Sequence, residues 1–181
     1  MHRSLFAAVL LVPALALSGC GSDSGSTAST SPSPSASVAS APAGDAVVDG
    51  VTVAGEPGQQ PTITVDSAVT PPTELVVKEL SPGDGKKISA NSVVSVQYAG
   101  VAWSNGQEFD SSWANNGGQP IEFPLQGVIT GWQEGLVGAT EGSRVLLVIP
   151  PDKGYGEQGS PPVIGPNETL VFVVDVEKVA S

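Results

Sequence analysis

The stretch from Gly127 to Leu136, Gly-Val-Ile-Thr-Gly-Trp-Gln-Glu-Gly-Leu, limits the folds open to this chain more than any other segment. The spacing of Thr130 and Gln133 is typical of a helix start, where the threonine caps the first turn and the glutamine bonds back to the cap. It predicts a helix of one to two turns, with Trp132 and Leu136 on one face. Because a helix this short and rich in glycine is unstable alone, the rest of the folded region must supply a surface on which it docks.

Strand patterns surround this helix from Glu74 onward. Asn105-Gly106 lies between two of them and is the strongest short signal for a hairpin. About five or six strands in roughly a hundred residues predict an α+β fold, a curved antiparallel sheet half-wrapped around one short helix. The stretches with strand-like patterns that give this estimate are Leu75–Leu80, Ser92–Ala99, Val101–Ser104, Gln107–Asp110, Ile121–Leu125, Arg144–Pro150 and Thr169–Val179.

The N-terminal residues 1–19 have the pattern of a signal peptide. Arg3 precedes an apolar run from Leu5 to Leu17, which is too short to remain as a membrane span. The small residues before Cys20, the single cysteine, resemble the lipobox of bacterial lipoproteins. That resemblance implies that Cys20 is lipid-modified and becomes the mature N-terminus, anchored outside the cytoplasm to the cell membrane. An ordinary secretory signal with an incidental cysteine stays the alternative.

Three further segments follow the signal peptide. After the cysteine, residues 20–44 are almost entirely Ser, Thr, Ala, Gly and Pro, a composition that predicts a flexible linker. Residues 45–73 contain short strand-like fragments broken by Gly and Pro. They form either an edge strand of the domain or a loosely ordered extension, and both alternatives stay open. Residues 74–181 are the predicted folded domain.

Charge and residue usage exclude several functions. The net charge is −11, and 13 acidic side chains stand against 6 basic ones from Glu74 onward, so a phosphate backbone would be repelled and no nucleic-acid partner is expected. The single histidine is His2. Beyond Cys20 the chain therefore has no imidazole base, thiol nucleophile, disulfide or Cys/His zinc site, and we expect neither a metal nor a cofactor.

Five motifs, in order along the chain, resemble the FKBP-type peptidyl-prolyl cis-trans isomerases. Together they extend over most of residues 74–179, and a combination of five is far more specific than any one of them. The motifs are Val96–Gly100, Gly106–Ser112, Val128–Leu136, Ile149–Gly156 and Thr169–Val176.

The resemblance implies a shallow apolar pocket between sheet and helix that accepts a proline ring. Trp132 would form its floor, and Ile129 would offer its backbone N–H to a substrate carbonyl. Tyr155 would present its hydroxyl, and Asp110 would orient the substrate electrostatically at the pocket edge, with no role as a proton-transfer base. The remaining substrate-binding residues implied by the resemblance are Tyr98, Phe109, Ile121, Phe123, Val128, Val163, Ile164 and Phe172.

Prolyl isomerisation fits a chain without catalytic histidine or cysteine, because rotation about the X-Pro bond moves no proton. We expect a monomeric isomerase that desolvates and twists the amide in its aromatic pocket. Its partners would be proline-containing segments of exported proteins during folding, and tacrolimus-like macrolides. Two alternatives remain: a non-catalytic chaperone or partner-binding module of the same fold, and a surface structural lipoprotein. Neither Trp103 nor Trp113 matches a pocket position, and both are expected to serve packing or the surface.

Overall fold

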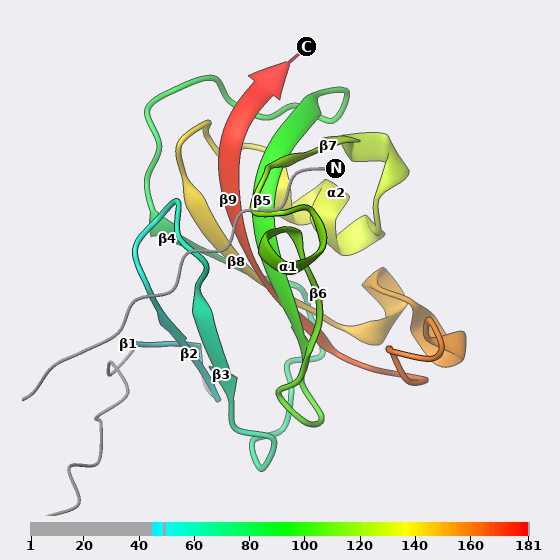
Figure 1. Cartoon of the computed structure of the whole chain (residues 1–181). Helices are drawn as coiled ribbons and strands as arrows, with labels where there is room; N and C mark the ends of the chain where they lie inside the picture. The colour runs from blue at the N-terminus through cyan, green and yellow to red at the C-terminus, as the bar shows by residue number, and fades with distance from the viewer. Residues whose placement is uncertain (1–44, 49, 181) are drawn as a thin grey trace, which may run out of the picture. The chain divides into compact units, whose positions relative to one another are not determined.

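The computed structural model describes residues 45–48 and 50–180. The predicted signal peptide, Cys20 and the linker of residues 20–44 lie outside the described residues. The main sheet is antiparallel and six-stranded, with the order β4-β8-β9-β5-β6, while β7 pairs with β5 beside β6 (Figure 1). Its strands are β4 Val76–Ser81, β5 Val93–Ala102, β6 Glu108–Ser111, β7 Ile121–Pro124, β8 Arg144–Ile149 and β9 Leu170–Ala180.

The two long strands β5 and β9 form the centre of this sheet. They pair from Val93 opposite Ala180 to Ala102 opposite Leu170, with one irregularity after Ser95. The predicted hairpin at Asn105-Gly106 is confirmed: it joins β5 to β6, and the Asn105 side chain accepts a hydrogen bond of 2.8 Å from the backbone N–H of Gln107. The expected sheet wrapped around one helix is therefore the observed fold.

The short helix α2, Thr130–Leu136, docks on one face of the sheet (Figure 1). A Cβ atom added to Gly131 would come within 2.4 Å of the side chain of Ile149, and one added to Gly135 within 2.7 Å of Leu147. The glycines therefore permit the close approach of helix and sheet, while Trp132 and Leu136 are buried between them.

The predicted cap of α2 is wrong in detail. The helix begins at Thr130 itself, the residue expected to cap it, with Ile129 in extended conformation at the N-cap and no side-chain cap bond. Gln133 does reach back, but its side-chain amide donates to the Val128 carbonyl at 2.7 Å. Thr130 therefore lies inside the first turn and does not cap it.

A second sheet covers the opposite face of the main sheet. Residues 45–73, for which the sequence left two alternatives, contribute β1 Asp45–Val48, β2 Val51–Ala54 and β3 Thr62–Val65 in the order β1-β2-β3. Successive side chains of β8 and β9 point to opposite faces, so one set packs under α2 and the other under this second sheet. The second core comprises Val51, Val53, Val101, Trp103, Leu146, Val148, Val171 and Val173.

Burial on both faces explains why β8 reads as an unbroken apolar run after Arg144, with every one of its residues buried. Trp103 belongs to the second core, where its indole N–H donates to the Val69 carbonyl at 3.0 Å.

The short helices of the connecting segments are α1 Ser112–Asn115 and the 3-10 turns η1 Leu125–Gly127, η2 Pro151–Lys153 and η3 Gly156–Gln158. Within the described part of the chain, no helix is long and apolar enough to cross a membrane.

Candidate active site

A pocket of about 490 Å³ opens between the start of α2 and the face of the sheet on which α2 lies. Strands from distant parts of the chain supply its walls, and the loop after β8 supplies one edge. The lining is almost wholly aromatic or aliphatic, with one carboxylate. The lining residues are Tyr98, Phe109, Asp110, Phe123, Gly127, Val128, Ile129, Trp132, Tyr155 and Phe172.

Trp132 lies at the centre of the aromatic lining and is 4% exposed. Three rings meet it nearly at right angles: Phe172 at 5.3 Å, Tyr98 at 5.4 Å and Phe123 at 6.0 Å between ring centroids. Phe109 in turn meets Phe172 at 5.4 Å and 87°. Edge-to-face contacts of this kind hold rings in defined orientations, so the pocket has a rigid apolar floor.

The polar groups of the site lie at one edge of this aromatic lining. The Tyr98 hydroxyl donates to Oδ2 of Asp110 at 2.7 Å, and the side-chain amide of Asn115 donates to Oδ1 at 2.7 Å. Burial raises the pKa of Tyr98, and the hydrogen bond and negative charge of Asp110 raise it further. Burial also raises the pKa of the partly exposed Tyr155, and the charge of Asp110 adds to that effect. Both phenols are therefore neutral hydrogen-bond donors at neutral pH.

The start of α2 forms the lip of the pocket. Val128 and Ile129 are in extended conformation, and the side chain of Gln133 holds the Val128 carbonyl. Gly127 also lines the pocket, which the sequence reasoning missed. Its place directly before Val128 and Ile129, which the resemblance did assign to the pocket, was a usable signal.

Three residues expected at the pocket do not line it. Ile121, the first residue of β7, packs against the core under α2. Ile164 is buried in that same core and is held by paired backbone hydrogen bonds with Ser160. Val163 precedes it and is 62% exposed. Neither Val163 nor Ile164 therefore lines the pocket, and Trp113 is likewise absent from the lining.

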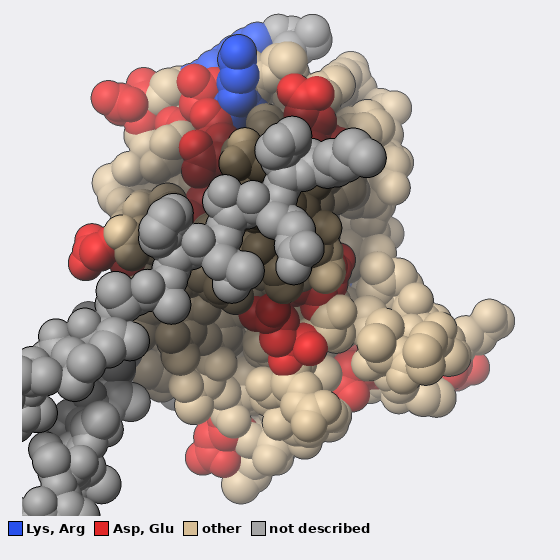
Figure 2. All heavy atoms as spheres, viewed as in Figure 1, with Lys and Arg blue, Asp and Glu red and all other residues tan. Residues whose placement is uncertain are grey.

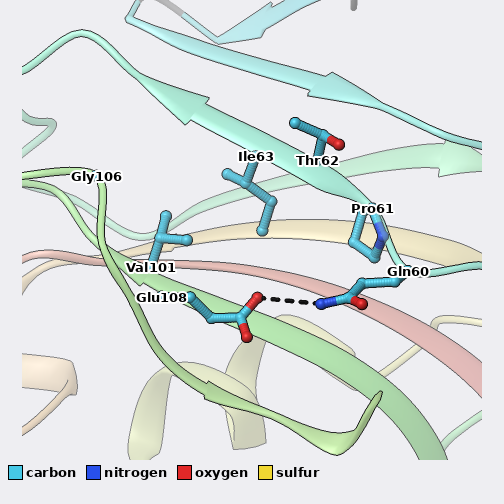
Figure 3. A pocket seen from close by; sticks show the side chains of 7 residues that line it. All are labelled: Gln60, Pro61, Thr62, Ile63, Val101, Gly106 and Glu108. Carbon is cyan, nitrogen blue, oxygen red and sulfur yellow. Dashed lines mark hydrogen bonds between the residues drawn. The ribbon is translucent and has the colours of Figure 1, made fainter. Parts of the chain in front are cut away.

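A second hollow, of about 330 Å³, lies between β3 and the β5–β6 hairpin (Figure 3). The side-chain amide of Gln60 lies 3.4 Å from a carboxylate oxygen of Glu108 at its margin. The hollow holds no ring other than that of Pro61, and its apolar lining is limited to Val101 and Ile63 besides that proline. The aromatic pocket, larger and more apolar, is the stronger candidate for a binding site.

The chemistry available at the aromatic pocket is non-covalent. Among the described residues, no group of three or more His, Cys, Asp or Glu side chains is placed to hold a metal ion. The pocket offers apolar surface, two phenol hydroxyls and one carboxylate. A rigid aromatic floor with a few polar groups at its edge suits an apolar ring attached to a peptide chain.

The chain belongs to the FKBP-type peptidyl-prolyl cis-trans isomerase family, whose model matches residues 84–177. It is 45% identical over 109 residues to an FK506-binding protein of Streptomyces anulatus, covering 59% of this chain and 86% of the relative. A probable FK506-binding protein of Corynebacterium glutamicum is 44% identical over 106 residues, covering 58% and 86%. The chain is accordingly an enzyme of the peptidyl-prolyl cis-trans isomerase class.

Solved structures show the same fold. The crystal structure of a peptidyl-prolyl cis-trans isomerase from Pseudomonas syringae pv. tomato matches with a TM-score of 0.54 and 37% identity, over 59% of this chain and 76% of the other. FkpA from Escherichia coli matches with a TM-score of 0.54 and 42% identity, over 59% of this chain and 48% of FkpA. The second sheet, from residues 45–65, lies outside the residues that the family model matches.

Proposed function

We propose that the isomerase binds the substrate's proline ring in the aromatic pocket, against Trp132. The observation that carries this assignment is the placement of Trp132 at the bottom of an apolar pocket, with three rings fixed edge-on around it. A five-membered aliphatic ring fits such a floor, while the peptide on either side of it would follow the polar edge.

The reaction needs only modest help from this site. The barrier to amide rotation is about 18–20 kcal/mol, because resonance gives the C–N bond partial double-bond character. A ~10⁴-fold acceleration requires about 5.5 kcal/mol of differential stabilisation. Removing the prolyl amide from water disfavours its charge-separated planar form, and a pocket that holds the ring while the preceding carbonyl turns favours the twisted state.

The polar groups have distinct roles in this proposal. The N–H of Ile129, at the N-cap of α2, would donate to a substrate carbonyl at the pocket lip. The Tyr155 hydroxyl would hold the flanking chain from the opposite edge. Asp110 would orient the substrate and contribute its charge. In this proposal none of these residues transfers a proton.

A protease-coupled assay with prolyl peptides tests the pocket assignment. We expect Trp132→Leu to lower kcat/KM about tenfold or more, equivalent to at least ~1.4 kcal/mol of transition-state stabilisation. Trp113→Leu is the matched control, because Trp113 lies outside the pocket lining. Equal kcat/KM values for the two variants would refute the assignment. If the unaltered protein binds the peptide but does not isomerise it faster than the uncatalysed rate, the result would instead favour a non-catalytic binding module.

We propose that macrolides of the FK506 class bind at the same pocket. Two relatives at 44–45% identity are called FK506-binding proteins, and an apolar, aromatic pocket with neutral phenol donors suits a large macrolide. FK506 should then inhibit the isomerase competitively, and Trp132→Leu should weaken the inhibition. Inhibition that does not compete with the peptide would count against a shared pocket.

We further propose that the isomerase is a lipid-anchored protein acting on exported clients outside the cytoplasm. The support is sequence-based: an apolar leader followed by Leu-Ser-Gly and the single cysteine, Cys20, ahead of a Ser/Pro/Ala-rich linker. Cys20→Ala should move the protein from the membrane fraction to the soluble fraction. Cys20→Ala protein that still sediments with membranes would contradict lipidation, while leaving the isomerase activity untouched.

A further inference from the structure

Of the residues that the structure describes, Asp110 has the only charged side chain that lines the aromatic pocket. Both of its carboxylate oxygens accept hydrogen bonds, one from the Tyr98 hydroxyl and one from the Asn115 amide, each at 2.7 Å. Both donors are neutral groups. The carboxylate is therefore fixed in direction while its negative charge remains uncompensated by a cation.

Asn115 is held in place by a closed ring of interactions. It is the last residue of α1, and the first, Ser112, is fully buried. The Ser112 hydroxyl accepts a hydrogen bond of 2.9 Å from the backbone N–H of Tyr98 and donates to the side chain of Gln97. Tyr98 thus holds Asp110 through its hydroxyl and holds the helix that carries Asn115 through its backbone.

The remainder of the loop is attached to the same strand. The side-chain amide of Gln97, which is itself 7% exposed, donates to the Gly118 carbonyl at 2.7 Å. The segment from Ser112 to Gly118 is therefore fixed to β5 at both ends. The direction of the Asn115 amide follows from this attachment, although Asn115 itself is exposed.

The surroundings of the pocket offer little positive charge to offset Asp110. Lys153, two residues before Tyr155, forms an ion pair of 2.7 Å with Glu134. No lysine or arginine of the described ranges, 45–48 and 50–180, occurs in the pocket lining. On the described part of the face in Figure 2, basic side chains lie along the upper edge, while acidic ones lie both there and lower down.

We propose that Asn115 is a positioning residue that holds the uncompensated Asp110 carboxylate at the pocket edge, and that this charge makes the isomerase prefer prolyl bonds preceded by a cationic side chain. The inference rests on the proposed binding of the proline ring at Trp132. It specifies which substrates that site prefers. Whether the site catalyses isomerisation is a separate question.

The expected preference is moderate. Charge pairs open to solvent contribute about 0.2–1 kcal/mol, so a cationic residue should raise kcat/KM by up to about fivefold over a neutral one. An acidic residue at the same place should lower it by a similar factor. Salt should weaken both effects, because the Debye length falls to about 8 Å at physiological ionic strength.

The first test compares three peptides that differ only before the proline, where they carry Lys, Gln or Glu. With the full-length protein we expect kcat/KM in the order Lys, Gln, Glu, converging as salt is added. Equal values for the three peptides, or an order unaffected by salt, would overturn the proposed preference. Loss of activity on all three would instead count against the proposed function of the pocket.

The second test separates positioning from simple folding. Asn115→Lys places a cation beside Asp110 and should lower the ratio of kcat/KM for the Lys peptide to kcat/KM for the Gln peptide to about one. Asn115→Ala should lower the same ratio less. The matched control is Asn116→Ala, because the Asn116 amide donates to the Gln119 and Pro120 carbonyls and not to Asp110. An Asn115→Lys protein that keeps the unaltered ratio, at an unchanged melting temperature, would refute the role of Asn115.

Discussion

Arg144 on β8 and Asp175 on β9 lie opposite each other in the strand register and form a buried ion pair. The loop between β2 and β3 completes the hydrogen bonds of both side chains. Arg144 donates to the carbonyls of Gly55 at 2.8 Å and Gln59 at 2.6 Å, and Asp175 accepts the Gly58 N–H at 2.8 Å. The two charges compensate each other, and the backbone of the β2–β3 loop satisfies the remaining hydrogen-bonding groups of the pair. The buried pair therefore links the main sheet to the second sheet.

Asp175→Asn should strongly destabilise the protein. It leaves the buried guanidinium without its counter-charge, and breaking a buried pair in this way costs about 3–5 kcal/mol. The measurement is the free energy of unfolding in urea. Glu177→Gln, on the same strand but exposed, should change it by less than about 0.5 kcal/mol. Similar stabilities for the two variants would contradict the importance of the pair.

Removal of residues 45–73 should expose an apolar face of the main sheet. Trp103, Leu146, Val148 and Val171 would lose the layer that covers them, and Arg144 would lose two carbonyl partners. We expect the shortened protein, residues 74–181, to bind a hydrophobic dye, to associate and to unfold at lower urea than residues 45–181. A monomeric fragment with unaltered stability would show that the second sheet is dispensable for folding.

The sequence predicted the main sheet more fully than the second one. Alternating strands such as that ending at Tyr98, and the Asn105-Gly106 turn, carry their structure in local patterns. The four-residue strands β1, β2 and β3 do not, because the face they cover is assembled from strands that include β9, more than a hundred residues farther along the chain. The unbroken apolar run of β8 was the available sign that both faces of the sheet are covered.

The same distinction holds at the candidate site. Trp132 on α2 and Phe172 on β9 line the pocket, whereas Ile121, also on a strand, does not. Val163 and Ile164 lie in an irregular turn, where no periodicity indicates side-chain direction, and Ile164 turns into the core. Asn115 escaped prediction because its role depends on a one-turn helix held by buried Ser112, a contact that sequence spacing does not reveal.

Gly131→Ala should destabilise the protein and reduce isomerase activity together. The added Cβ would lie 2.4 Å from a buried side-chain carbon of Ile149, and overpacking of this kind costs about 1–3 kcal/mol. Alanine also favours helix by up to about 1 kcal/mol, so the net loss is smaller than the clash alone. Gly165→Ala is the control, since nothing lies within 4 Å of its added Cβ. Activity retained at reduced stability would show that the pocket does not depend on how closely α2 docks.

The two tyrosines of the chain, Tyr98 and Tyr155, should both ionise above the ordinary tyrosine pKa of about 10. Burial raises the pKa of each, and the charge of Asp110 contributes to both. The folded protein therefore keeps protons that the unfolded chain releases, so stability is unaffected below about pH 10 and falls as the pH rises from there towards the folded-state values.

Ultraviolet titration of tyrosinate measures these ionisations directly. At pH 10 we expect about half of the full tyrosinate signal in denaturant, where the pKa is about 10, and less than that in the native protein. Asp110→Asn should shift the native titration to lower pH, because the negative charge that opposes both phenolates is removed. Tyr155→Phe isolates Tyr98, and a remaining group that titrates near pH 10 would contradict the burial of that hydroxyl against Asp110.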